Sequence, residues 1–131
     1  MLRIPTPLSD ELEMLIHQVI GCCIAVHRDL GPGLLESIYK RAVCIELELA
    51  GIPFETEKAI PVVYRGRLLS RQRVDLVVGG LLVIEIKAVD RVNPVHEAQL
   101  LCYRRVSKLP VGLLMNFNVP VLKKGLQRMV L

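Results

Sequence analysis

The spacing of apolar residues predicts two helices at the start of the chain. From about Asp10 to Leu30 they recur at helical intervals, the members being Leu12, Leu15, Ile16, Val19, Cys23, Val26 and Leu30. Ser9 is a suitable N-cap, and Gly31-Pro32-Gly33 ends this helix. A second helix is expected from about Leu34 to Ala50, before Gly51. Its apolar stripe is Leu35, Ile38, Ala42, Ile45 and Leu49.

Shorter apolar runs in the middle of the chain predict β-strands. Strands are expected over about 59–64 and 68–78, and another over 82–88 after a Gly79-Gly80 turn. Asn93-Pro94 is typical of a helix start, so a third helix is expected to about Ser107. The run 111–117 predicts a central strand, and 121–130 a last strand. The order α-α-β-β-β-α-β-β indicates an α/β fold, a mixed sheet flanked by helices in two or three layers.

Length and composition favour one compact domain. The 131 residues are expected to form a single domain over 1–131, with residues 1–8 as an irregular arm. Apolar residues make up 52% of the chain, but there is no Trp, so aliphatic packing must build the core. The net charge of +4 permits contact with nucleic acid without requiring it. The aliphatic surplus leaves room for a subunit interface, so a homo-oligomer is one expectation.

The cysteines and the absence of a long apolar run indicate a cytoplasmic protein. Cys22, Cys23, Cys44 and Cys102 form no C-x-x-C pair, and their spacing suits neither a zinc site nor a disulfide framework. We expect them to be mostly buried small hydrophobes in a reducing compartment. No run approaches the roughly 18 apolar residues of a membrane helix, and the N-terminus lacks a signal-peptide pattern, so no membrane contact is expected.

The most informative charges lie on the predicted hairpin over 68–88. Asp75, Glu85 and Lys87 stand among valines, leucines and isoleucines, where a charge is costly unless it is paired or binds a metal. Two carboxylates with a lysine two residues on could hold a divalent cation and help a water attack a phosphodiester. The alternative is an ion-pair cluster, with Asp75 bound to Arg73 and Glu85 to Lys87.

The alternation of side chains predicts the register of this hairpin. The apolar sets are Val74, Leu76 and Val78 on one strand and Leu82, Ile84 and Ile86 on the other. Uniting them on one face places Asp75 opposite Glu85 and Arg73 opposite Lys87, with a three-residue loop at 79–81. A two-residue Gly-Gly turn would instead place Asp75 opposite Ile84 and split the polar set. We expect the first register.

Two helices carry further polar candidates. Glu36 and Tyr39 lie three residues apart near the start of the second helix, where an acid also compensates the helix dipole. On the third helix His96, Gln99 and Tyr103 form a polar stripe, opposite a face with Val95, Leu100 and Val106. Such a stripe is commonly the solvated face of a helix. Gln and Tyr, however, also suit hydrogen bonds to phosphate oxygens or to a catalytic lysine.

Taken together and in order, these segments resemble a known family. Gly33 to Tyr39 has the form G-x-x-E-x-x-Y, and it is followed by Arg73-Val74-Asp75, Glu85-Ile86-Lys87-Ala88, the run from His96 to Tyr103, and Val111 to Phe117. The chain is similar over about residues 10–131 to the small GxxExxY protein family. That family is placed in the PD-(D/E)XK nuclease superfamily, in the branch similar to RecB-type nucleases.

The resemblance implies a fold, a chemistry and a set of roles. It implies a restriction-endonuclease-like core in which Asp75 and Glu85 bind metal and Lys87 orients or activates water. It implies that Glu36 helps to hold a metal, and that Gln99 and Tyr103 support the lysine and the backbone phosphate. Tyr39, Arg73 and His96 are further candidates for contacting or supporting the substrate.

The leading functional hypothesis is therefore a nuclease that uses Mg²⁺ or Mn²⁺ and acts on DNA. Oxygen ligands favour these ions over zinc. The rival hypothesis is a non-catalytic module that keeps the nuclease fold and binds nucleic acid or a protein partner.

Overall fold

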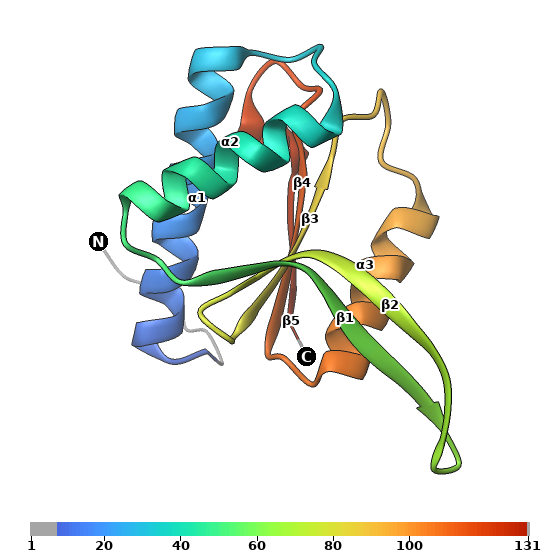
Figure 1. The fold of residues 1–131 in the computed structure, drawn as a ribbon. Coiled ribbons are helices and arrows are strands. Elements are labelled where there is room, and N and C mark those ends of the chain that lie inside the picture. The colour runs from blue at the N-terminus through green and yellow to red at the C-terminus, as the bar shows by residue number, and fades with distance from the viewer. Residues whose placement is uncertain (1–7, 131) are drawn as a thin grey trace.

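The computed structural model describes residues 8–130, which form a five-stranded sheet with helices on both faces (Figure 1). The elements are α1 (Asp10–Leu30), α2 (Glu36–Leu49), β1 (Phe54–Tyr64), β2 (Arg67–Val78), β3 (Leu82–Lys87), α3 (Pro94–Ser107), β4 (Val111–Asn116), the 3₁₀ helix η1 (Leu122–Gly125) and β5 (Leu126–Val130). The predicted order of helices and strands is confirmed. The arm expected at residues 1–8 lies outside the described residues except for Leu8.

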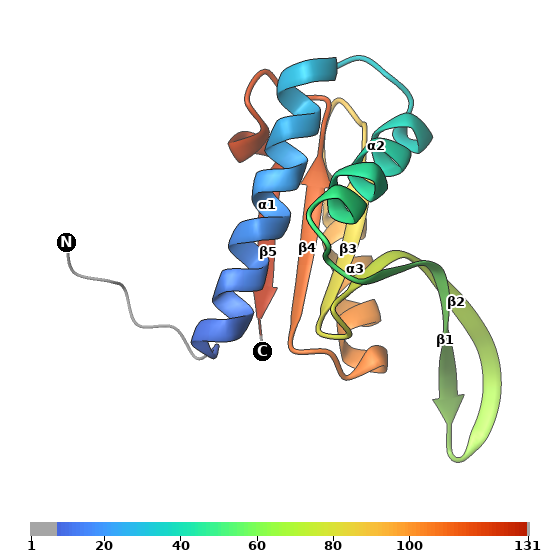
Figure 2. The same ribbon diagram turned by 60° about the vertical axis from the view of Figure 1, so that its left-hand side comes forward.

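The sheet is mixed, as predicted, and its strands follow the order β1-β2-β3-β4-β5. Among the described strands, β3 and β4 are parallel neighbours and the other three pairs are antiparallel. A parallel pair needs a crossover connection, and α3 supplies it. Helices α1 and α2 lie on one side of the sheet and α3 on the other, so the fold has three layers (Figures 1 and 2).

The predicted starts of two helices are confirmed by their caps. Ser9 Oγ accepts a hydrogen bond from the Leu12 amide at 3.1 Å at the start of α1. Asn93 Oδ1 accepts from the amides of Val95 and His96 at 3.0 and 3.4 Å, with Pro94 as the first residue of α3. These local bonds satisfy amides that a helix start leaves free.

The buried face of α2 differs from the predicted one. Tyr39, Val43 and Leu47 are fully buried, whereas the expected stripe is turned outward, with Leu35 71% and Leu49 77% exposed. Both stripes are apolar and helical in spacing, so the pattern alone could not choose between them. The choice is made by Tyr39, whose ring stacks on Phe117 at a centroid distance of 4.7 Å. The exposed stripe keeps the homo-oligomer as a prediction.

The two edge strands of the sheet, β1 and β5, start at other residues than predicted. β1 starts at Phe54 rather than near residue 59, and the last strand starts at Leu126 because η1 takes up the preceding residues. At Gly125 the chain approaches β4 so closely that a Cβ would lie 2.1 Å from the Asn116 carbonyl oxygen. His27 Nε2 also lies 2.8 Å from the Val119 carbonyl oxygen, which ties this segment to α1.

The core is divided by the sheet into two clusters. The cluster on the α1 and α2 side includes Leu76, Val78, Ile84 and Ile86. Val74 was expected to share that face, but it is buried in the other cluster, with Leu100 of α3. The strict alternation of β2 is therefore broken next to Asp75, where side-chain hydrogen bonds replace regular pairing.

The cysteines follow the expectation only in part. Cys22 and Cys23 are buried and Cys44 is half-buried, but Cys102 is exposed on α3, and all four are free thiols. Cys102 is exposed because α3 packs on the sheet through Leu100, Tyr103 and Arg104. In the described part of the chain, no helix combines the length and apolarity needed to cross a membrane.

Candidate active site

The hairpin that carries the candidate acids has the predicted register. Leu76 pairs with Ile84, Val77 with Val83 and Val78 with Leu82, which leaves the loop 79–81. Gly79 and Gly80 have φ of 61° and 67°, values that glycine adopts without strain. Extending this register by one step sets Asp75 opposite Glu85.

Beyond Leu76 and Ile84, the two carboxylates replace the backbone pairing of the strands. The Asp75 amide donates to Glu85 Oε1 at 3.2 Å, and the Ile86 amide donates to Asp75 Oδ2 at 2.8 Å. Each acid is thus held by the backbone of the opposite strand. These bonds fix the two carboxylates beside each other at the end of the β2–β3 ladder.

Glu85 is the more buried of the two acids, with 5% of its surface exposed. Burial, followed by the charge of Asp75, raises the pKa of Glu85 to about 7, against the opposing effects of the Asp75 amide and Lys87. Two carboxylates this close favour sharing a proton or a cation. The pair is therefore a ready acceptor for a positive charge.

Two lysines flank the acids, and only one was predicted. Lys87 Nζ lies 3.9 Å from Glu85 Oε2, and Lys40 Nζ lies 3.5 Å from Asp75 Oδ1. Lys40 also forms an ion pair with Glu57. The expected ion pair between Glu85 and Lys87 is thus present, but the cation beside Asp75 is Lys40 of α2 rather than Arg73. The signal for Lys40 was its position four residues after Glu36, on the same helix face.

Glu36 approaches the acids without joining them. It is the first residue of α2 and is exposed. Its carboxylate is partly screened from solvent, and this partial burial and the charge of Asp75 raise its pKa overall, against the opposing charge of Lys87. Its carboxylate therefore lies within electrostatic reach of the site. Among the described residues, however, no three His, Cys, Asp or Glu side chains are grouped closely enough to bind a metal together.

Tyr39 supports the site from the core. It is fully buried, so it cannot touch a substrate from this position. Its hydroxyl donates to the Gly31 carbonyl oxygen at 2.5 Å and accepts from the Leu34 amide at 3.0 Å. These bonds fix the turn that leads into α2, and with it the position of Glu36.

The residues of the polar stripe on α3 make two different kinds of contact. Gln99 Nε2 donates to the Tyr103 hydroxyl at 2.7 Å. Burial and then the charge of Glu85 raise the pKa of Tyr103, so this pair lies near the acids. His96 instead serves the helix start, because its Nδ1 accepts from the Asn93 amide at 3.3 Å. Val95, expected on the buried face, is 72% exposed, since it lies in the first turn of α3.

Arg73 does not take the predicted place. It is exposed and pairs with Ala59 of β1, and the β2–β3 ladder ends at Leu76. The expected pair of Arg73 with Lys87 is therefore not formed. The reason is the break in β2 at Asp75, beyond which β2 leaves β3 and continues with β1 alone.

Asn116 is a buried residue that the sequence interpretation missed. Its Oδ1 accepts from the Val89 amide at 3.0 Å, and its Nδ2 donates to the Val89 carbonyl oxygen at 2.9 Å. The neighbouring Phe117 amide donates to the Lys87 carbonyl oxygen at 2.8 Å. Together these bonds fix the backbone at Lys87 and in the two residues that follow it. An asparagine ending an otherwise apolar run was the available signal.

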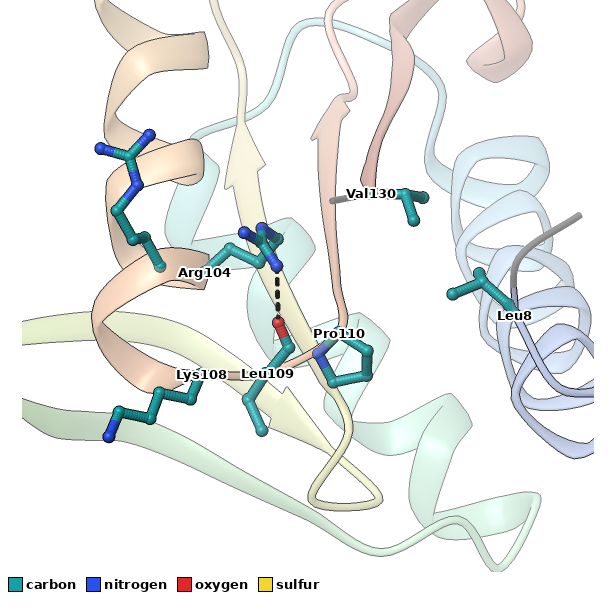
Figure 3. Close-up of a pocket in the computed structure, with 7 residues that line it drawn as sticks. Leu8, Arg104, Lys108, Leu109, Pro110 and Val130 are labelled. Atoms are coloured by element: carbon teal, nitrogen blue, oxygen red, sulfur yellow. Dashed lines mark hydrogen bonds between the residues drawn. The ribbon is translucent and has the colours of Figure 1, made fainter.

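A separate hollow of about 390 Å³ lies at the other end of α3 (Figure 3). It is lined by Leu8, Arg104, Arg105, Lys108, Leu109, Pro110 and Val130. Arg104 is 2% exposed and donates through Nη1 to the Leu109 carbonyl oxygen at 3.2 Å, while its buried Nε has no partner among the described residues. None of the predicted site residues lines this hollow.

Comparison with known families agrees with the geometry. Residues 13–129 match the family model of the PD-(D/E)XK nuclease superfamily. This range contains all of the predicted site residues. No match is found among curated proteins or among solved structures.

Proposed function

The chain belongs to the PD-(D/E)XK nuclease superfamily, and we propose that it is a divalent-metal-dependent nuclease that hydrolyses phosphodiester bonds in DNA. The observation that carries this proposal is the paired carboxylates of Asp75 and Glu85 with Lys87 beside them. The narrower assignment to the GxxExxY family rests on the motif at 33–39.

The donor set fits Mg²⁺ or Mn²⁺. Both candidate ligands offer carboxylate oxygens, which suit these hard cations. Burial and then the charge of Asp75 raise the pKa of Glu85, and a cation bound at this position would offset both effects. When bound, such an ion supplies an acidified water and neutralises charge on the scissile phosphate.

Glu36 is the third candidate ligand. It is exposed at the start of α2, and the charges of Asp75 and Lys87 influence the pKa of its carboxylate. A change of rotamer could bring it to a metal held by the other two acids. Asp75 and Glu85 would then hold the metal, and Glu36 would add a third carboxylate.

Lys87 would act on the reaction through its charge. In hydrolysis, the oxygen of a water forms a bond to phosphorus and the ester bond to the leaving oxygen breaks. The water proton passes to solvent, and the leaving oxygen takes up a proton. The Lys87 ammonium would orient the attacking water and stabilise negative charge that develops on the phosphate. Gln99 and Tyr103 would support the phosphate from α3.

One observation favours a second candidate, a non-catalytic module that binds nucleic acid or protein. Lys40 and Lys87 already accompany the two acids, so the cluster has cations without a metal. In that case the wild type would not bind Mn²⁺ more tightly than Asp75→Asn does. Calorimetric titration of both proteins with Mn²⁺ distinguishes the two functions.

The direct test is nicking of supercoiled plasmid in Mg²⁺ or Mn²⁺, with EDTA as the blank. We expect the wild type to nick the plasmid and Lys87→Ala to lose about 10²–10³ in rate, as removal of a charge that acts in the transition state does. Lys123→Ala removes an exposed lysine on η1 and should keep full activity. Equal activity in all three proteins would indicate a contaminant and contradict the proposal.

A further inference from the structure

The β1–β2 hairpin extends far beyond the rest of the fold as a two-stranded arm (Figures 1 and 2). We call residues 58–74 the basic arm. From Val63 to Arg73 every residue is exposed, including Tyr64 at 59% and Leu69 at 64%. A ribbon with neither face covered gains little stability from burial. Packing against the rest of the fold therefore does not account for the length of the arm.

The net positive charge of the chain comes from this arm. Residues 58–74 contain five basic side chains and no acidic one, namely Lys58, Arg65, Arg67, Arg71 and Arg73. Removing these five charges from the net +4 of the chain leaves −1 for all other residues. Lys58 is paired with Glu55, whereas none of the four arginines forms an ion pair with a described carboxylate. The arm thus offers uncompensated positive charge.

Three of the four arginines lie on β2, the strand that also carries Asp75. Ile60 and Val74 are buried in the cluster on the α3 side, so Arg71 and Arg73, at alternate positions of β2, face away from α3. Arg73 precedes Asp75 by two residues, which is about 7 Å along a strand. From Asp75 to Arg67 the strand spans about 27 Å, the length of about eight base pairs at 3.4 Å each.

We propose that the basic arm binds the phosphate backbone and groove of double-stranded DNA and so presents the duplex to Asp75 and Glu85. This inference rests on the proposed nuclease function and names the substrate as duplex. The major groove of B-form DNA admits a two-stranded β-ribbon, whereas that of A-form RNA is too deep and narrow. Single strands are disfavoured because they are bound largely by aromatic stacking, and Tyr64 is the one aromatic residue of the arm.

The test is equilibrium binding of a fluorescent 30-base-pair DNA duplex in EDTA, where no cleavage interferes. The arm variant replaces Arg65, Arg67, Arg71 and Arg73 with Gln. Each lost phosphate contact lowers the slope of log affinity against log salt by about 0.9, so the slope should fall by about 3–4. At 100 mM salt the affinity should fall by about tenfold or more. An unchanged slope and affinity would overturn the inference.

Three controls isolate the arm. Replacing four exposed cations elsewhere, Arg28, Arg105, Lys123 and Lys124, with Gln should change the slope by less than about 1. Replacing the four arm arginines with Lys should keep most of the affinity, and a loss as large as that of the Gln set would overturn a role through charge. The wild type should bind the DNA duplex more tightly than an RNA duplex or a single strand of the same sequence. Equal binding to either would overturn the proposal.

The outcome also separates this inference from the proposed function. If the protein binds duplex DNA through the basic arm but never nicks it, the proposed nuclease function is contradicted and the proposed role of the arm is supported. If the protein nicks DNA but the arm variant binds the duplex as well as the wild type does, the nuclease function is supported and the role of the arm is contradicted.

Discussion

Asp75 and Glu85 are bound to each other's strand: the Asp75 amide donates to Glu85 Oε1 at 3.2 Å, and Asp75 Oδ2 accepts from the Ile86 amide at 2.8 Å. The pair lies where the β2–β3 ladder ends. Beyond it, β2 pairs with β1 alone and forms the basic arm. Because both acids are fixed by backbone groups, their proximity does not depend on a metal. The site is therefore formed in advance, at the cost of repulsion between like charges.

The burial of Glu85 beside Asp75 predicts how stability depends on pH. The pKa of Glu85 rises from an ordinary 4.5 to about 7 in the folded protein, mainly through burial and then through Asp75. The folded state thus holds a proton that the unfolded state has released. The free energy of unfolding should be greatest below pH 4.5 as far as Glu85 is concerned, and this contribution should be lost as the pH rises to 7.

Glu85→Gln should remove this dependence and, without metal, exceed the wild type in stability at pH 8. The difference should be on the order of 2–3 kcal/mol. Urea unfolding between pH 4 and pH 8 measures it, with Glu48→Gln on the exposed side of α2 as the matched control. Parallel pH profiles for the wild type and Glu85→Gln would contradict the assignment.

Lys40 predicts opposite effects on stability and on metal binding. Its Nζ lies 3.5 Å from Asp75 Oδ1, so it offsets the repulsion between the acids and also opposes a second cation. Lys40→Met should lower the free energy of unfolding by about 1–2 kcal/mol. The same change should raise the affinity for Mn²⁺ several-fold in calorimetry.

The control for Lys40 is Lys58→Met, which removes a lysine paired with Glu55 outside the site. It should alter neither quantity. If Lys40→Met weakens Mn²⁺ binding, the lysine supports the metal site instead of competing with it, and this account of Lys40 is wrong.

Tyr39 is expected to matter for the fold beneath Glu36. In Tyr39→Phe the Gly31 carbonyl oxygen and the Leu34 amide each lose their bond to the hydroxyl. The free energy of unfolding in urea should fall by about 1–2 kcal/mol. Tyr64→Phe, at an exposed tyrosine of the arm, should change it by less than about 0.5 kcal/mol. Equal effects of the two substitutions would show that the buried hydroxyl has no special role.

The sequence predicted those features that local patterns determine. The hairpin register followed from alternation and the Gly79-Gly80 loop, and the starts of α1 and α3 followed from their capping residues. The proximity of Asp75 and Glu85 was a consequence of that register.

Other features depend on contacts between distant segments, which periodicity does not contain. The buried face of α2 was chosen by Tyr39 stacking on Phe117, and the placement of Val74 by the break at Asp75. Lys40 reaches the site only because α2 crosses the sheet there. Asn116 could be noticed in its apolar run, but its role depends on a loop that precedes it by 27 residues.

Metal binding by Asp75 and Glu85 is tested by the position of Mn²⁺ in crystals soaked with the ion, measured by anomalous scattering. We expect a peak about 2 Å from carboxylate oxygens of both Asp75 and Glu85, with Glu36 turned toward it. A well-ordered crystal saturated with Mn²⁺ that shows no peak between these two acids, while Lys40 and Lys87 remain paired with them, would contradict it.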